Sequence, residues 1–225
     1  MIANKEEKNG RASMSLEKTK PTDYMRTVTD YPVGGVNFYD VNSLFAQPAW
    51  NQVAAELAVD IQQLFTKNGE ITHIVGIESR GFVVGAVLAS VIGVPFVMLR
   101  KKGSKYPGSL LEQTYGTEYS EDTIVLQEGI LGHTNRVLIV DDLIATGGSI
   151  MAAKKLIERT DAKVVGMACI INIKYLNDQG LSDQTIVTSE TIHALSDVIP
   201  GPPPTEPLKW SYELEENGNT KEITK

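Results

Sequence analysis

Residues 136–149, RVLIVDDLIATGGS, constrain the fold more than any other part of the chain. An apolar, largely β-branched run predicts a buried parallel strand. Two adjacent carboxylates follow, then a turn of small residues, and then a helical pattern that begins at Ile150. In open parallel sheets, ligands bind beyond the carboxyl ends of the strands. The segment therefore predicts an α/β fold with a ligand site at this strand–turn–helix junction.

The chemistry of the turn indicates what the ligand is. Glycines let the backbone approach an anion closely, and the first N–H groups of the next helix favour a phosphate. Asp141 and Asp142 are unsuited to binding a phosphate directly, but they suit two vicinal hydroxyls such as those of a ribose. The segment therefore predicts a site for a ribose 5-phosphate. The residues of the turn are small or carry a hydroxyl donor, namely Ala145, Thr146, Gly147, Gly148 and Ser149.

Composition excludes several other classes of protein. The 225 residues are 42% hydrophobic, which predicts one domain with a substantial core and with extensions. A net charge of -7 argues against a nucleic-acid-binding surface. The single cysteine, Cys169, excludes an intramolecular disulfide framework. No long apolar run and no secretory leader are recognisable, so a cytoplasmic location is expected. Residues 76–81 have P-loop spacing, but Phe82 stands where that motif requires lysine, and there is no GxGxxG fingerprint.

The DDLIATGGS sequence resembles the 5-phosphoribosyl 1-pyrophosphate (PRPP) signature of the type I phosphoribosyltransferases, in the form found in their adenine-specific members. The resemblance implies an open, mainly parallel twisted sheet with helices on both faces and a small N-terminal hood. It implies that Asp141 and Asp142 bind the ribose of PRPP, while residues 145–149 bind the 5-phosphate. Mg²⁺ is the implied cofactor, held through PRPP near the two aspartates with no direct protein ligand.

Two further segments resemble the family's pyrophosphate site. Residues 78–81, ESRG, lie between an expected strand at 72–77 and an expected helix at 82–92, and they place a guanidinium at a helix start. In the family, the peptide at the position of Glu78 and Ser79 is commonly cis. Residues 100–108, RKKGSKYPG, resemble the family's RKKGKLPG. The pyrophosphate-binding residues implied by this resemblance are Glu78, Ser79, Arg80, Arg100 and Lys102. Arg100 is expected to reach the neighbouring site of a homodimer.

The expected purine site is formed by a hood over residues 31–44, YPVGGVNFYDVNSL, which resembles the family's FPxPGxxFRDIxPL. By this resemblance Phe38 stacks on the base, the backbone near Asn37 contacts its edge, and Ile173 forms the other side of the slot. Tyr39 replaces the usual arginine, and Asn37 replaces an aliphatic residue with a donor and an acceptor. The DDLIATGGS form and the hood both resemble the adenine enzymes, so adenine is the expected base, while Tyr39 and Asn37 leave hypoxanthine, guanine and xanthine as open alternatives.

Residues 103–123 are expected to form a long flexible loop that resembles the family's catalytic lid. The resemblance implies that Glu118 is a general acid/base at a purine nitrogen, and that Tyr115 and Tyr119 belong to the lid. Ser120 replaces the usual glycine. From the residues alone, Glu118 is equally readable as one of several exposed acids.

The expected organisation is a polar, poorly ordered arm at 1–22, a phosphoribosyltransferase domain at 23–200 and a Pro-rich exit with a polar tail at 201–225. The implied reaction converts adenine and PRPP to AMP and pyrophosphate, which is purine salvage. The expected partners are PRPP, a purine base and a second copy of the chain, with no nucleic acid and no membrane. A non-catalytic PRPP-sensing regulator is the alternative, although too few residues precede the hood for the DNA-binding domain of such regulators.

Overall fold

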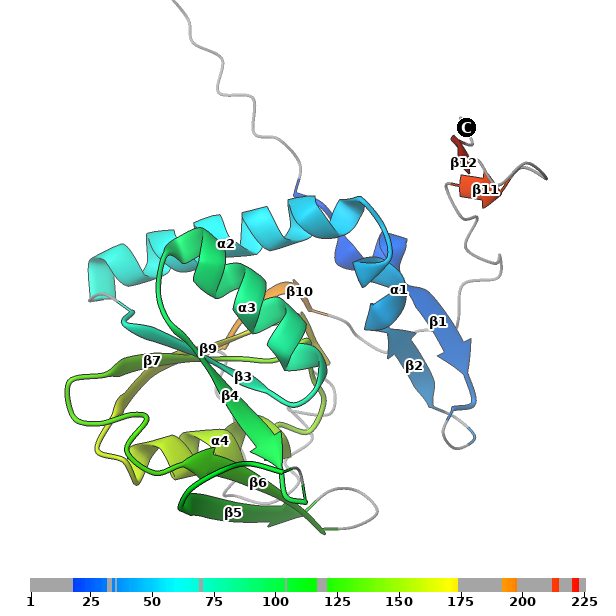
Figure 1. The fold of residues 1–225 in the computed structure, drawn as a ribbon. Helices are drawn as coiled ribbons and strands as arrows, with labels where there is room; N and C mark the ends of the chain where they lie inside the picture. The colour runs from blue at the N-terminus through cyan, green and yellow to red at the C-terminus, as the bar shows by residue number, and fades with distance from the viewer. Residues whose placement is uncertain are drawn as a thin grey trace, which may run out of the picture.

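The computed structural model describes residues 18–31, 34, 36–68, 71–103, 105–116, 121–173, 192–197, 212–214 and 220–222. Their main feature is an eight-stranded, mainly parallel sheet (Figure 1). The parallel part runs in the order β10 (Ile192–Asp197), β9 (Lys163–Asn172), β7 (Arg136–Val140), β3 (His73–Ile77) and β4 (Phe96–Lys101). Strands β6 (Glu121–Gln127) and β5 (Leu110–Gly116) add antiparallel pairs beyond β4, and the short β8 (Leu143–Ile144) pairs with β9.

Helices cover both faces of this sheet. Helices α2 (Ala49–Asn68) and α3 (Arg80–Ile92) lie on one face and α4 (Gly148–Glu158) lies on the other (Figure 1). The alternation within β7 explains this arrangement, because Leu138 and Val140 pack toward α2 and α3 while Val137 and Ile139 pack toward α4. Both faces of the strand are therefore buried, and the predicted fold class is confirmed.

Small residues allow α3 to lie close to the sheet. A Cβ atom on Gly76 of β3 would lie 2.6 Å from the carbonyl oxygen of Gly81 and 2.9 Å from the Phe96 ring. A Cβ atom on Gly85 of α3 would lie 2.7 Å from the same ring. Contacts this short leave no room for a methyl group. The first turn of α3 is thereby held directly over the carboxyl end of β3, where the sequence predicted an anion site.

The hood segment contains an antiparallel hairpin followed by a short helix. The one-turn 3-10 helix η1 (Pro21–Tyr24) leads into β1 (Arg26–Thr29), which pairs with β2 (Asn37–Asp40), and α1 (Val41–Phe45) follows. Arg26 and Asp40 form an ion pair of 2.6 Å across the hairpin. The backbone N–H of Arg26 also donates to Oγ of Ser43 at 2.7 Å. These bonds fix the hairpin to α1 and so fix the orientation of Phe38 within β2.

The segment at 103–123 differs from the expected loop. Residues 110–116 form β5 and residues 121–123 begin β6, and the register of the pair runs from Leu110↔Gln127 to Gly116↔Glu121. Alternate residues of β5 are half-buried, and Leu111 and Tyr115 pack against the core on the α4 side. This pairing with β6 and packing on α4 involve residues distant in sequence, which local glycine and polar content does not reveal.

Some of the predicted residues lie outside the described part of the chain. Glu118, Tyr119 and Ser120 belong to this group, as do residues 1–17 of the expected arm and most of the expected tail. Within the tail, β11 (Tyr212–Leu214) and β12 (Thr220–Glu222) form an antiparallel pair. None of the helices in the described ranges has the length and apolar character needed to cross a membrane.

Candidate functional site

Asp141 and Asp142 lie directly after β7, and the backbone holds them rigidly. The N–H of Asp141 donates to the carbonyl of Ala168 at 3.1 Å, and the carbonyl of Asp142 accepts from the N–H groups of Ile170 and Ile171 at 3.1 and 3.2 Å. The N–H of Asp142 donates to Oδ1 of Asp141 at 2.9 Å. The pair is therefore fixed between β7 and β9, with Asp142 only 2% exposed and Asp141 partly exposed.

The electrostatics of this pair favour a ligand that donates hydrogen bonds. Burial raises the pKa of both carboxyl groups, the adjacent Asp142 raises that of Asp141 further, and Arg80 opposes the rise at both. Nε of Arg80 lies 2.7 Å from Oδ2 of Asp142 as an ion pair. That contact lacks hydrogen-bond alignment, so Oδ2 has no hydrogen-bond partner among the described residues. A buried acceptor left in this state gains by receiving a hydroxyl donor.

The turn after the carboxylate pair leads into the N-terminus of α4. Gly147 is the N-cap residue and adopts a left-handed φ of 82°. No side chain caps this helix start, so its first N–H groups are directed to the turn without a side-chain partner. The end of β5 lies beside this turn, because a Cβ atom on Gly148 would be only 3.2 Å from the carbonyl oxygen of Gly116. This combination of open N–H groups and a helix dipole suits an anion.

The predicted pyrophosphate loop joins β3 to α3. The Glu78–Ser79 peptide is cis, as the resemblance implied, and Ser79 is the N-cap residue of α3. Oε2 of Glu78 accepts a hydrogen bond from the backbone N–H of Lys101 at 2.7 Å and lies 3.6 Å from Nε of Arg100. Glu78 therefore anchors this loop to the basic residues at the end of β4, while Arg80 faces Asp142.

The cations of the basic segment have different partners. Cζ of Arg100 lies 5.5 Å from the centroid of the Tyr106 ring. Nζ of Lys102 lies 2.6 Å from Oε2 of Glu112 on β5, and both side chains are well exposed. Exposed ion pairs of this kind contribute little and exchange readily. Lys102 can therefore leave Glu112 for an anionic ligand.

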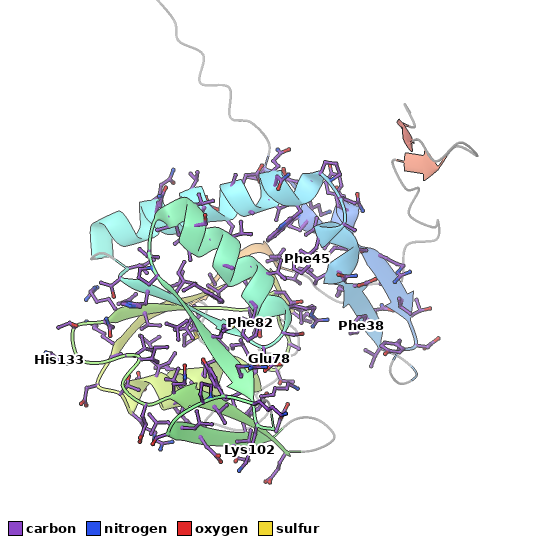
Figure 2. The ribbon with its side chains drawn as sticks, viewed as in Figure 1. Phe38, Phe45, Glu78, Phe82, Lys102 and His133 are labelled. Carbon is purple, nitrogen blue, oxygen red and sulfur yellow. The ribbon has the colours of Figure 1, made fainter. Side chains whose placement is uncertain are left out.

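The hood meets the carboxylate pair through Arg80. Cζ of Arg80 lies 5.9 Å from the centroid of the Phe38 ring, on the same guanidinium that contacts Asp142. Tyr31 packs edge-on against Phe38 with ring centroids 5.2 Å apart. Figure 2 shows Phe38 on the hood and Glu78 on the neighbouring loop. This contact thus brings one predicted pyrophosphate-binding residue, Arg80, beside one predicted base-binding residue, Phe38.

The remaining predicted base-site residues occupy different environments. Asn37 begins β2 opposite Thr29 and is partly exposed. Tyr39 packs against the core on the α2–α3 side, and burial raises the pKa of its phenol. Ile173 is buried in that same core at the end of β9, where its N–H donates to the carbonyl of Ile144 at 2.9 Å. The side chain of Tyr39 is therefore partly buried against the core, whereas an arginine at this position would extend its charged end into solvent.

Sequence reasoning missed two contributions to this site. A Cβ atom on Gly81 would lie 2.9 Å from both Oδ1 of Asp141 and the carbonyl oxygen of Val140, so the glycine lets α3 pack against the carboxylate pair. Lys101 was not among the predicted site residues, unlike Arg100 and Lys102, yet its Nζ lies 2.6 Å from Oδ2 of Asp122. Successive side chains of a strand point to opposite faces, so the strand pattern could have indicated that Lys101 faces away from Arg100 and Lys102.

Comparisons with known proteins agree with this geometry. The sequence profile of the phosphoribosyl transferase domain family matches residues 40–204. The adenine phosphoribosyltransferase of Rhodospirillum rubrum is 43% identical over 155 residues, covering 68% of this chain and 87% of the relative. That of Bacteroides fragilis is 37% identical over 182 residues, covering 78% and 99%.

Solved structures show the same relationship. The adenine phosphoribosyltransferase of Saccharomyces cerevisiae, solved with an imino-altritol bisphosphate and adenine, has a TM-score of 0.68 at 30% identity and covers 77% of this chain and 94% of its own. That of Rhodothermus marinus has a TM-score of 0.65 at 36% identity and covers 78% and 94%. A parallel sheet with this carboxylate pair and glycine turn defines a phosphoribosyl-transferring enzyme. The chain belongs to the phosphoribosyl transferase family, and the four relatives named here are adenine phosphoribosyltransferases.

Proposed function

We propose that this protein transfers the phosphoribosyl group of PRPP to adenine, producing AMP and pyrophosphate in purine salvage. The observation that carries the proposal is the fixed carboxylate pair of Asp141 and Asp142, which directly precedes the uncapped start of α4. The similarity to adenine phosphoribosyltransferases supports adenine as the base. We also propose a cytoplasmic location, because highly charged PRPP does not cross an apolar barrier unaided.

In this proposal, Asp141 and Asp142 accept hydrogen bonds from the two ribose hydroxyls. Charge-assisted bonds of this kind are worth about 1.5–3 kcal/mol each. The 5-phosphate is bound by residues 145–149, where hydroxyl donors and the N–H groups of the first turn of α4 converge. The strand holds the carboxylates and the helix holds the phosphate, so the ribose is oriented from both ends.

Pyrophosphate is the leaving group, and its developing charge needs cations. We assign this role to Arg80, Arg100 and Lys102, with Ser79 and Glu78 shaping the loop. Arg80 exchanges Asp142 for the pyrophosphate when PRPP binds, because a doubly ionised phosphate group attracts a guanidinium more strongly than one carboxylate does. The phosphoribosyl centre becomes electron-poor as this bond breaks, and the base then attacks it.

The purine is bound between the hood and the sheet. We assign stacking to Phe38, edge contacts to the backbone near Asn37, and the opposite wall to Ile173. Glu118 moves the proton at the purine nitrogen, and the lid residues Tyr115 and Tyr119 exclude water from this step.

The donor set at the carboxylate pair fits Mg²⁺. This ion takes oxygen ligands and is usually bound by one or two carboxylates together with substrate phosphates. Asp142 offers an oxygen that lacks a hydrogen-bond partner, and Asp141 lies beside it. No cluster of three acidic, His or Cys ligands occurs among the described residues. We therefore propose that Asp141 and Asp142 would hold Mg²⁺ together with PRPP, and that the bound ion would supply positive charge against the pyrophosphate.

Turnover with a panel of bases tests the proposal. We expect AMP formation from PRPP and adenine, at least about 100-fold faster than product formation from hypoxanthine, guanine or xanthine, because a site built to pair with one purine edge leaves buried polar groups unpaired with another. Chelation of Mg²⁺ is expected to abolish turnover, and added Mg²⁺ to restore it. Activity on a 6-oxopurine with none on adenine would overturn the choice of base and point to Asn37 as its cause.

A homodimer in which Arg100 reaches the neighbouring site is also part of the proposal. Val83 and Val91 lie two helical turns apart on α3 and are 41% and 53% exposed, and Met98 of β4 is 41% exposed. Met98 and Arg100 face the same side of the sheet, the side that α3 covers. An exposed apolar surface that continues into a site residue suits a second copy.

Sedimentation velocity tests the dimer. We expect the wild-type chain to sediment as a dimer and a Val83→Glu/Val91→Glu variant to sediment as a monomer of much lower activity, because burying two carboxylates in an apolar interface is costly. A Val59→Glu variant, which changes an exposed valine on α2, serves as the control. A wild-type monomer with full activity would refute the dimer.

A further inference from the structure

Tyr115 lies at a junction between the β5–β6 hairpin and the predicted phosphate turn. It pairs directly with Asp122 across the two strands. Its ring also packs on the α4 side of the sheet, where its Cδ2 lies 3.6 Å from the position of a Cβ atom on Gly148. Tyr115 therefore packs beside the first residue of α4, at the end of the predicted phosphate turn.

The phenol of Tyr115 remains protonated at neutral pH. Burial and the neighbouring Asp122, with a smaller contribution from Asp141, raise the pKa of Tyr115 to about 12. Its Oη can therefore donate to Oδ2 of Asp122, at a long 3.5 Å.

Asp122 connects Tyr115 to the basic segment. Its Oδ2 lies 2.6 Å from Nζ of Lys101, and its Oδ1 accepts a hydrogen bond from the N–H of Thr123 at 2.9 Å. The backbone N–H of the same Lys101 donates to Glu78 of the pyrophosphate loop. One contiguous set of contacts thus runs from the pyrophosphate loop, through Lys101 and Asp122, to Tyr115 at the phosphate turn.

We propose that Asp122 is a positioning residue for phosphoribosyl transfer, which ties the loop end of the β5–β6 hairpin to Lys101 and sets Tyr115 against the turn at Gly147 and Gly148. This role rests on the proposed function, and it adds a residue that touches neither substrate. Its physical basis is geometric. The same contacts link the pyrophosphate loop to the turn before α4, so they fix the relative positions of the two predicted anion-binding loops.

The expected signature separates positioning from simple stabilisation. The ion pair of Asp122 and Lys101 is partly exposed, and such pairs contribute little to folding stability. Placement of a catalytic group is far more sensitive, since a misplacement of about 1 Å can cost up to about 100-fold in rate. Asp122 should therefore affect kcat much more than it affects Tm or PRPP affinity.

An Asp122→Asn variant tests this directly. We expect kcat to fall about 10- to 100-fold, with the Kd for PRPP from titration calorimetry within about twofold and with an unchanged Tm. Glu121→Gln removes the same charge from the adjacent exposed position of β6 and should behave as wild type. Asp122→Glu, which keeps the carboxylate, should recover part of the lost kcat.

A double-mutant cycle with Lys101→Met adds a second criterion. If both residues act through one contact, the loss of kcat in the double variant should equal that of the larger single variant rather than the product of the two. An Asp122→Asn variant with wild-type kcat would overturn the proposal, as would a loss of kcat that is matched by losses of Tm and PRPP affinity. A wild-type enzyme that is inactive with every purine would instead refute the proposed function, and this role with it.

Discussion

Replacing Glu118 with alanine is expected to lower kcat by about 10²- to 10⁴-fold, which is the usual contribution of a general acid or base. PRPP affinity should stay within about twofold of wild type, because the carboxylate acts on the purine and not on the phosphoribosyl donor. Glu118 lies outside the described residues, but the strand ends that flank it are paired at Gly116↔Glu121. The carbonyl of Gly116 lies beside Gly148 at the phosphate turn. The described strand ends on either side of Glu118 therefore lie close to the phosphate turn.

Pre-steady-state turnover with saturating PRPP and adenine measures this effect. Glu118→Gln should resemble Glu118→Ala, since an amide keeps the shape but cannot exchange the proton. Glu112→Ala changes an exposed acid of β5 that forms an ion pair with the exposed Lys102, and it should lose far less activity. If the Glu118→Ala variant turned over normally, the assignment of the lid would be wrong, and another group would have to donate or accept the proton at the purine nitrogen.

Replacing Asp141 and Asp142 together with asparagine is expected to weaken PRPP binding by at least about 100-fold, because two charge-assisted hydrogen bonds of about 1.5–3 kcal/mol each become weaker neutral ones. Asparagine keeps the shape of aspartate, so the backbone bonds to β9 should survive. Arg80 loses its partner at small cost, because its side chain is 42% exposed.

The same double variant is expected to be more stable than wild type at pH 7. The pKa of each carboxyl is raised in the folded state, so the folded protein binds protons more readily than the unfolded chain does. The free energy of unfolding then falls as pH rises through the interval between the unfolded and folded pKa values. The ionised pair therefore destabilises the folded state at neutral pH. Removing the two charges should raise Tm at pH 7, and this increase in Tm should shrink as pH falls below the unfolded-state pKa near 3.8.

Titration calorimetry with PRPP and thermal unfolding across pH 3–8 check these two results together. Asp161→Asn is the matched control, because Asp161 is exposed at the α4–β9 turn and its positive φ of 63° suits asparagine equally well. Unchanged PRPP affinity in the double variant would count against the ribose-binding role. A lower Tm of the double variant at pH 7 would show that the two carboxylates stabilise the fold and do not destabilise it.

The local patterns of the sequence determined the elements around the site. The apolar run before Asp141 forms β7, the glycines after it form the turn, and Gly147 has the positive φ that a glycine accepts freely. The ESRG sequence likewise forms the junction of β3 and α3, with Glu78 and Ser79 in the loop and Arg80 and Gly81 in the first turn of the helix. These features were predictable because each depends on neighbouring residues and on a hydrophobic period that the chain itself displays.

The β5–β6 hairpin was not predictable in the same way. Gly103, Gly108 and Gly116 and the polar residues between them are typical of a loop, and no local signal opposed that interpretation. The pairing of Leu111 with Leu126, together with the packing of Tyr115 on α4, supplies the free energy that makes this segment a strand. Such cross-strand contacts depend on the tertiary arrangement, so propensity alone does not reveal them.

The sequence by itself determined the family, the parallel α/β sheet and the cradle at Asp141, Asp142 and the glycine turn, because those residues are contiguous. Only the tertiary structure decided how the separate pieces meet. It placed Arg80 between Asp142 and Phe38, and it set Lys101 against Asp122. Those partners lie roughly 20 to 60 residues apart in the chain, and only the close packing of strands and helices brings their charges within a few ångströms.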